Sequence, residues 1–250
     1  MSNSDRSTDF GFEKVPWPEK AARVRSVFDS VASKYDVMND LMSLGAHRLW
    51  KHFTLSLTGL RRGQRALDVA AGTGDLARGM LRQVGKEGRV VLSDVNARML
   101  ETGRDRLIDR GFVGNLECLV ADAERLPFAD DSFDCVTIGF GLRNVTDKAA
   151  ALRSMRRVLK PGGQLLILEF STPAFAALKP FYDAYSFHAL PLLGRIVAGD
   201  AASYRYLAES IRMHPDQEGL LDMLRAAAFA EARYHNLSGG IVAVHRGYKT

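Results

Sequence analysis

The stretch from Arg65 to Asp75, which reads RALDVAAGTGD, most constrains what this chain can fold into. Its first half is an apolar run that is too short for a helix, so it predicts a buried strand. Gly72 and Gly74 follow, and residues without a Cβ let the backbone turn tightly and lie against a ligand. Residues 76–81 then place apolar side chains at helical spacing. A strand, a glycine turn and a helix in this order are typical of a nucleotide site in an α/β sheet.

An acidic residue in this predicted strand helps to distinguish between two kinds of nucleotide-binding site. A dinucleotide site has the pattern G-x-G-x-x-G, whose looser form tolerates Ala77 in the third position. Asp68, however, precedes Gly72 closely and would repel a pyrophosphate. A carboxylate there suits a cationic ligand, and the ammonium and sulfonium groups of S-adenosylmethionine meet that demand. The simpler alternative is that the glycine turn only connects a strand to a helix.

The next predicted strand, residues 89–93, leads directly into Asp94. This acid follows Gly74 at about the twenty-residue spacing of the ribose-binding acid in a βαβ unit. Its carboxylate can accept hydrogen bonds from both ribose hydroxyls. Alternatively, Asp94 caps the helix that follows. Asn96 can fill that role equally well, which would leave Asp94 for the ligand.

A third acid, Asp122, follows the predicted strand at residues 116–120. The carboxyl end of a strand lies on the ligand side of an open α/β sheet. A carboxylate in this position can accept a hydrogen bond from the exocyclic amine of an adenine. The alternative is that Asp122 only caps a turn.

The predicted strand at residues 133–138 ends near Arg143 and Asn144. An arginine can stabilise a developing phenolate, and an asparagine can hold a water or a hydroxyl group. We therefore expect this pair to be catalytic. The alternative is that Asn144 or Thr146 caps the next helix while Arg143 pairs with a nearby acid.

Composition narrows the class of protein. The 250-residue chain is 46% hydrophobic, which predicts one α/β domain with additions. Its formal charge of +5 is scattered, which favours a solvated surface and no nucleic-acid partner, with weak attraction to anionic membranes or nucleic acid as the alternative. Cys118 and Cys135 fall in predicted strands and indicate a reducing compartment. The histidines lack metal-ligand spacing, so we expect no metal site. We also expect no secretory signal and no membrane span.

The order of the predicted elements is that of an α/β domain. A loose segment to about residue 18 precedes helical pieces over 19–33, 38–45 and 47–57. The predicted strands are 65–69, 89–93, 116–120, 133–138 and 164–169, with helices at 75–84, 97–110, 148–159 and 216–227 and an antiparallel pair at 232–236 and 241–248. We divide this single domain into a helical cap (1–62), a nucleotide-binding core (63–170), an insertion (171–214) and the last helix with the strand pair (215–250).

The insertion at residues 171–214 is rich in aromatic and apolar side chains. Ordinary helix packing would account for such a composition. The functional alternative is that it walls a cavity for a bulky apolar substrate, because such pockets are mostly hydrophobic with a few polar groups.

Together these residues resemble a class I S-adenosylmethionine-dependent methyltransferase, and more narrowly the ubiquinone/menaquinone biosynthesis C-methyltransferase family. The resemblance extends from about Val27 to Thr250. The segments that carry it are FDSVASKYDVMND (28–40), LDVAAGTG (67–74), GFGLRNVTD (139–147), YSFH (185–188), YRYLAESI (204–211) and HRGYK (245–249), whereas LKPGG (159–163) is common to many methyltransferases. The resemblance implies a Rossmann-like seven-stranded sheet with an N-terminal helical cap and a helical insertion before the last core helix.

The resemblance also implies an activity: transfer of a methyl group from S-adenosylmethionine to a ring carbon of a polyprenylated quinol. The acceptor would be the methoxybenzoquinol precursor of ubiquinone, demethylmenaquinol, or both. The cofactor-binding residues then expected are Asp68, Gly72, Thr73, Gly74, Asp94, Asp122 and Ala123, with Thr73 and Ala123 coming from the resemblance alone. Where the family has a serine that contacts the cofactor, this chain has Gly139, so a contact there is restricted to the backbone.

In this interpretation Arg143 stabilises a phenolate directly or through a water held by Asn144. Tyr35 and the N-terminal helices would close over the cofactor and exclude water. The isoprenoid tail would lie along residues 171–214 and point toward a membrane. We therefore expect a cytoplasmic protein with peripheral contact to the inner face of the membrane, and other quinone-biosynthesis proteins as partners. The alternatives are an O- or N-methyltransferase of the same fold, a nicotinamide-dependent oxidoreductase, and a non-catalytic S-adenosylmethionine-binding scaffold.

Overall fold

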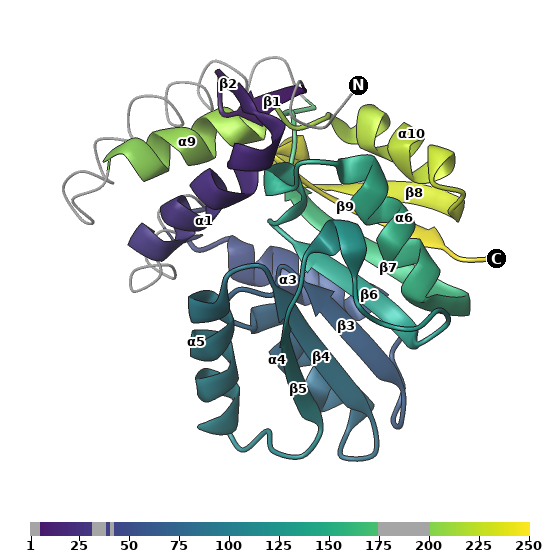
Figure 1. The fold of residues 1–250 in the computed structure, drawn as a ribbon. Helices are drawn as coiled ribbons and strands as arrows, with labels where there is room; N and C mark the ends of the chain where they lie inside the picture. The colour runs from purple at the N-terminus through teal and green to yellow at the C-terminus, as the bar shows by residue number, and fades with distance from the viewer. Residues whose placement is uncertain (1–5, 32–38, 41–42, 175–200) are drawn as a thin grey trace.

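The computed structural model describes residues 6–31, 39–40, 43–174 and 201–250, and a seven-stranded sheet lies at its centre (Figure 1). The strand order is β5-β4-β3-β6-β7-β9-β8, parallel from β5 to β7 and antiparallel at β9 and β8. The strands are β3 (Arg65–Val69), β4 (Arg89–Asp94), β5 (Leu116–Val120), β6 (Phe133–Gly139), β7 (Leu159–Phe170), β8 (Ala230–Leu237) and β9 (Val242–Tyr248). This sheet confirms the predicted fold class and the predicted antiparallel pair.

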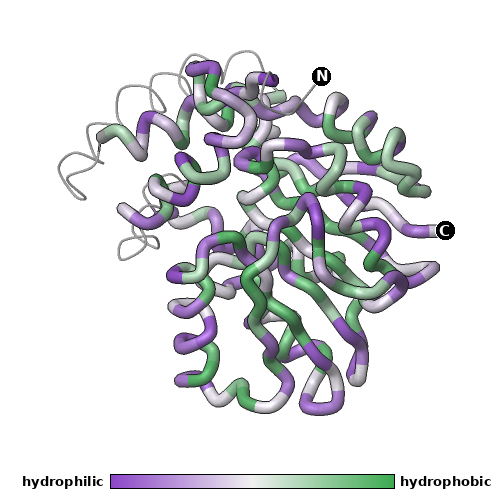
Figure 2. The backbone as a smooth tube through the Cα atoms, viewed as in Figure 1, coloured by the Kyte–Doolittle hydropathy of each residue, from purple (hydrophilic) through white to green (hydrophobic). Residues whose placement is uncertain are grey.

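Helices cover both faces of the sheet because alternate strand residues point to opposite sides. The helices are α3 (His47–Leu57), α4 (Asp75–Val84) and α5 (Ala97–Ile108) on one face, and α6 (Lys148–Val158) and α10 (Gln217–Ala226) on the other. Ala66 and Leu67, for example, are adjacent in β3 but belong to different core clusters. Figure 2 shows hydrophobic residues concentrated along the central strands. Strands buried on both faces read as continuous apolar runs, which is the pattern that the sequence displays.

The N-terminal segment adds a cap beside the carboxyl ends of the parallel strands. It consists of a hairpin of β1 (Ser7–Phe10) and β2 (Glu13–Pro16), followed by α1 (Lys20–Val31), and it lies beside α9 (Ala201–Arg212) (Figure 1). The ring of Phe10 stacks on that of Tyr206 with centroids 4.2 Å apart. The backbone N–H of Phe12 donates to Glu209 Oε2 at 3.1 Å. The prediction of a loose segment to residue 18 is therefore wrong for the hairpin, which distant contacts hold in place.

Two other predictions differ from the structure or fall outside it. The strand expected over 164–169 begins earlier, at Leu159, and continues through Gly162, whose φ of +78° suits a residue without a Cβ. Residues 38, 41 and 42 of the second helical piece, and residues 175–200 of the insertion, lie outside the described part of the chain. Within the described residues, none of the helices combines the length and the apolar composition needed to cross a lipid bilayer.

Candidate active site

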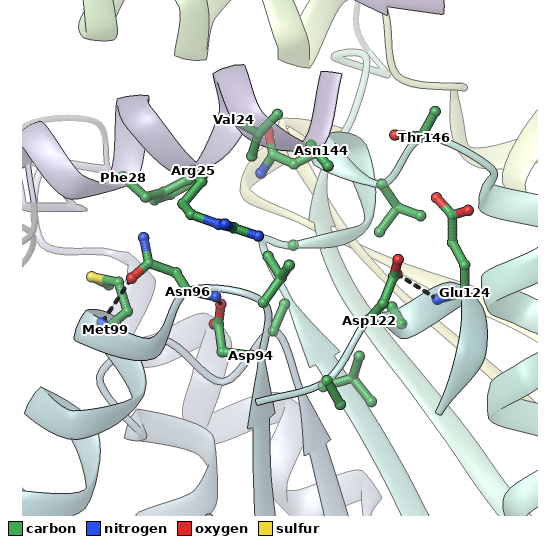
Figure 3. A pocket seen from close by; sticks show the side chains of 18 of the residues that line it. Val24, Arg25, Phe28, Asp94, Asn96, Met99, Asp122, Glu124, Asn144 and Thr146 are labelled. Carbon is green, nitrogen blue, oxygen red and sulfur yellow. Dashed lines mark hydrogen bonds between the residues drawn. The ribbon is translucent and has the colours of Figure 1, made fainter. Parts of the chain in front are cut away.

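A cavity of about 270 Å³ opens at the carboxyl ends of β3, β4, β5 and β6. The order of the strands reverses between β3 and β6, and crevices at such points are where open α/β sheets bind ligands. Acidic side chains lie on the sheet side of the cavity, and Val24, Arg25 and Phe28 of α1 face them from the cap (Figure 3). Sheet and cap therefore share the site.

The glycine turn after β3 forms the floor of this cavity. Ala70, Gly72 and Gly74 all have positive φ, at 50°, 54° and 78°, so the chain reverses sharply before α4 begins. A Cβ on Gly103 of α5 would lie 2.7 Å from the Gly72 carbonyl oxygen, so helix and turn are in close contact. Gly72 lines the cavity, whereas Gly74 caps α4 behind it. The turn thus brings backbone against the ligand space, as the sequence predicted.

Asp94 at the end of β4 lines the cavity and is held by the turn. Its Oδ2 accepts from the Gly72 N–H and its Oδ1 from the Asn96 N–H, both at 2.9 Å. Burial raises the pKa of this carboxyl, although these backbone bonds oppose the change. Asn96 caps α5 by accepting from the Met99 N–H at 3.1 Å. The cap is therefore Asn96, and both Asp94 oxygens retain lone pairs for a ligand.

Asp122, after β5, lines the next part of the cavity (Figure 3). Ala123 beside it also lines the cavity. The Oδ1 of Asp122 accepts from the Glu124 N–H at 2.9 Å, so the side chain caps a short turn. That bond uses one of its two carboxylate oxygens. Asp122 therefore fills the structural role that was left open and also faces the site.

Asp68 lies deeper, in a smaller chamber that adjoins the cavity. It is 2% exposed and accepts from Thr137 Oγ1 at 2.6 Å and from the Ala77 N–H at 3.1 Å. Burial raises its pKa to about 7, although both hydrogen bonds favour the charged form. Thr73 lines the same chamber. The cofactor residues expected from the sequence, apart from Gly74, are therefore divided between two adjoining spaces.

Arg143 and Asn144, which were expected to act together, occupy different surroundings. The Arg143 side chain is 3% exposed and pairs with Glu169 Oε1 at 2.7 Å, while its Nη1 also donates to the Phe140 carbonyl at 2.6 Å. It is not among the residues that line the cavity. Asn144 does line it, and its Oδ1 accepts from the Tyr206 hydroxyl at 3.0 Å. The helix cap anticipated as an alternative role is supplied by Asp147 instead.

Sequence reasoning missed several residues of the site. Arg25 of α1 lines the cavity, and Lys51 of α3 lines the small chamber. Tyr206 of α9 lies in the insertion and in the YRYLAESI segment named above, but its hydrogen bond to Asn144 was not predicted. Arg25 and Lys51 come from helices outside the sheet, where no local motif marks a ligand contact. Tyr35 lies outside the described residues, so its expected role stays a prediction. The described residues contain no group of three or more His, Cys, Asp or Glu side chains able to hold a metal ion.

Gly139, where the resemblance implies a serine, lines both the cavity and the small chamber. A Cβ at this position would lie 2.8 Å from Cδ1 of the buried Leu76. A side chain here would require that leucine to shift. The glycine thus leaves only backbone atoms facing the ligand.

The residues present fit S-adenosylmethionine. Asp94 and Asp122 offer acceptors in the larger space, as a ribose and an adenine amine require. The glycine turn permits close approach, and the chamber beyond it carries the acids that suit a cation. Val24 and Phe28 of α1 add apolar surface on the other side of the cavity.

Comparison with known proteins agrees with this geometry. The chain resembles solved structures of low sequence identity, which support the fold alone: a SAM-dependent methyltransferase from Aquifex aeolicus (TM-score 0.61, 18% identity, 85% of this chain and 98% of that one) and the [4+2]-cyclase SpnF (TM-score 0.59, 18% identity, 92% and 96%). The second shows that this fold does not fix the reaction.

Full-length relatives are much closer in sequence. Proteins named ubiquinone/menaquinone biosynthesis C-methyltransferase UbiE are 63% identical in Serratia proteamaculans, over 97% of both chains, and 60% identical in Pseudomonas paraeruginosa, over 99% of this chain and 97% of that one. The model of the ubiE/COQ5 methyltransferase family matches residues 18–249. The chain therefore belongs to the ubiE/COQ5 methyltransferase family.

Proposed function

We propose that this enzyme transfers a methyl group from S-adenosylmethionine to a ring carbon of a polyprenylated quinol in ubiquinone biosynthesis, menaquinone biosynthesis, or both. The observation that carries the proposal is the cavity at the strand reversal, with Asp94 and Asp122 on one side and the apolar face of α1 on the other. The names of the full-length relatives support carbon methylation over the O- or N-methyl alternative.

S-adenosylmethionine supplies a methyl group that its sulfonium already activates, so the protein has to orient the acceptor and keep water out. The acceptor carbon becomes nucleophilic when a neighbouring phenol loses its proton. A phenol titrates near 10, like tyrosine, so this step requires help at neutral pH. The groups that help must offer hydrogen bonds to the developing phenolate oxygen.

Asn144 is suited to this task because its amide is already oriented. The Tyr206 hydroxyl occupies Asn144 Oδ1, which leaves the two N–H donors of the amide for other partners. Burial raises the pKa of Tyr206, so its hydroxyl keeps its proton and remains a donor. We propose that the Asn144 amide binds the phenolate oxygen or a water next to it.

Arg143 would stabilise the negative charge of the phenolate without contacting the substrate directly. Its Nη1 is used by Glu169 and the Phe140 carbonyl, but its buried Nε–H makes no hydrogen bond among the described residues. A buried donor without a protein partner is typically satisfied by water. We propose that this donor holds a water that links Arg143 to Asn144. The expected role through a water thus fits the geometry better than direct contact with the substrate.

The location of the enzyme follows from its acceptor in this proposal. A polyprenyl tail partitions into lipid, so the enzyme would work in the cytoplasm with peripheral contact to the inner face of the membrane. Leu44 and Leu49, which are 82% and 73% exposed near the start of α3, offer an apolar contact. Other quinone-biosynthesis proteins would then be its neighbours on that surface.

The test uses purified protein, methyl-labelled S-adenosylmethionine and two chemically reduced acceptors: a demethylated polyprenyl methoxybenzoquinol and demethylmenaquinol. We expect label on a ring carbon of at least one acceptor, located by mass spectrometry, and the ratio of rates assigns the pathway. Label on oxygen or nitrogen, or no transfer despite tight binding of S-adenosylhomocysteine, would contradict the proposal.

A further inference from the structure

The small chamber beyond the glycine turn carries a set of charges that the proposed reaction has not used. It shares Ala70, Gly139 and Phe140 with the large cavity, so the two spaces adjoin. At about 20 Å³, against about 270 Å³, it can receive only the end of a ligand. Its ionisable lining consists of Lys51, Asp68 and Asp75.

Lys51 is placed in this chamber by α3, which precedes the sheet in the chain. Its Nζ donates to Asp75 Oδ2 at 2.7 Å, and its side chain is 14% exposed. An ammonium group has three donors, and this bond is the one that Lys51 makes within the described part of the chain. Two donors therefore remain for a ligand.

The opposite charge lies across the same chamber. The buried Asp68 carboxyl is close enough to Lys51 for the lysine to lower its pKa, against the larger effect of burial. A ligand end that carries both an anion and a cation would match this arrangement. The methionyl end of S-adenosylmethionine has an α-carboxylate and an α-ammonium group.

We propose that Lys51 binds the α-carboxylate of S-adenosylmethionine, while Asp68 faces its α-ammonium group. This inference rests on the proposed function, because it names the residue that orients the cofactor in the same site. Asp94 and Asp122 would fix the adenosine end in the large cavity, so the methionyl end would cross the turn toward Lys51. The helix α3, which covers one face of the sheet, thereby becomes part of the cofactor site.

If Lys51 had a purely structural role, a different effect of replacing Lys51 and Asp75 would be expected. In that case its task is to pair with Asp75, the first residue of α4, and removing either partner would have the same effect. If Lys51 binds the ligand, Asp75 competes with the carboxylate for the ammonium group. Replacing Asp75 would then leave ligand affinity unchanged or increase it.

The experiment measures the affinity of the purified full-length protein for two ligands by calorimetry. One is S-adenosylhomocysteine, and the other is its decarboxylated analogue, S-adenosyl-3-thiopropylamine, which lacks only the α-carboxylate. We expect Lys51→Met to weaken S-adenosylhomocysteine binding by about 10- to 100-fold, the value of a charge-assisted hydrogen bond. Binding of the analogue should change by less than about threefold, because the group that Lys51 binds is missing.

Three variants complete the design. Lys51→Arg should keep most of the affinity for S-adenosylhomocysteine, and Asp75→Asn should bind it at least as tightly as the unmodified protein. Lys86→Met removes a charge from an exposed residue just after α4 and should change neither affinity. Equal losses for both ligands in Lys51→Met, or a matching loss in Asp75→Asn, would overturn the inference. Failure of the unmodified protein to bind either ligand would instead overturn the proposed function.

Discussion

At the scale of single residues, Asp68 shows how the site combines burial with charge. The carboxyl is 2% exposed, and burial raises its pKa to about 7, about three units above the value for an exposed aspartate. Hydrogen bonds from Thr137 and Ala77 keep the charged form accessible. A cationic ligand in the adjoining chamber would lower this pKa again, because the opposite charge favours the carboxylate. Ligand binding and ionisation of Asp68 are therefore linked.

This linkage predicts a pH-dependent affinity. Below about pH 7 the free protein carries protonated Asp68, so binding the ammonium group of S-adenosylhomocysteine must release a proton. Affinity should then fall as the pH falls below 7, with a slope approaching tenfold per pH unit. Calorimetry in buffers of different ionisation enthalpy measures the released proton. Burial also raises the pKa of Asp94, so Asp68→Asn is the control. An unchanged slope in that variant would contradict the assignment to Asp68.

Tyr206 gives a second prediction at this scale. Tyr206→Phe removes the donor that holds Asn144 Oδ1, so the amide can rotate away from its working orientation. We expect kcat to fall by about 2- to 10-fold, the range for one neutral hydrogen bond, with little change in S-adenosylhomocysteine affinity. Tyr234→Phe is the matched control, because that hydroxyl bonds to Glu218 on the protein surface. A parallel loss of cofactor affinity in Tyr206→Phe would indicate a general structural defect instead.

At the scale of elements, local patterns predicted the sheet well. The bounds of β3, α4 and β5 agree with the prediction, because short apolar runs and glycines define them without help from distant residues. The positions of Asp94 and Asp122 followed from the rule that parallel strands end on the ligand side. The β1–β2 hairpin could not be predicted, since it depends on contacts such as Phe12 with Glu209, 197 residues away. The same reason concealed Lys51 and the hydrogen bond of Tyr206 to Asn144, because their helices reach the site only through tertiary packing.

The N-cap of α6 supports a prediction about one element. Asp147 accepts from the Ala150 N–H at 2.8 Å and begins the helix that follows the Asn144 loop. Asp147→Ala should lower the free energy of unfolding by about 1 kcal/mol, since a half-buried helix terminus loses its cap. Asp147→Asn should lose much less, because asparagine caps about as well as aspartate. Urea denaturation of both variants measures the difference, and equal losses would show that the charge matters more than the cap.

At the scale of the whole molecule, the site lies between α1 of the cap and the carboxyl ends of the sheet strands. Val24, Arg25 and Phe28 of α1 form the cap side of the cavity, and the acids at the strand ends form the other (Figure 3). Asn96 Nδ2 donates to Asp29 Oδ1 at 2.8 Å and so connects the β4–α5 turn to α1. The antiparallel strands β9 and β8 lie at the opposite edge of the sheet from β5 and contribute nothing to the cavity lining.

This arrangement predicts which elements of the protein a bound ligand stabilises. S-adenosylhomocysteine at about 100 times its dissociation constant should add about 2.7 kcal/mol and raise Tm by about 5–10 °C. Hydrogen–deuterium exchange should slow in α1 and around the β4–α5 turn, because the ligand contacts both. Amides of β8 and β9 that exchange through local opening should change little, because these strands do not line the cavity. Asp29→Ala removes the direct bond between α1 and Asn96 and should reduce the protection of α1 while that of the turn remains. Equal slowing in β8 and α1 would mean that cap and sheet open as one cooperative unit, and that the ligand does not join separate parts.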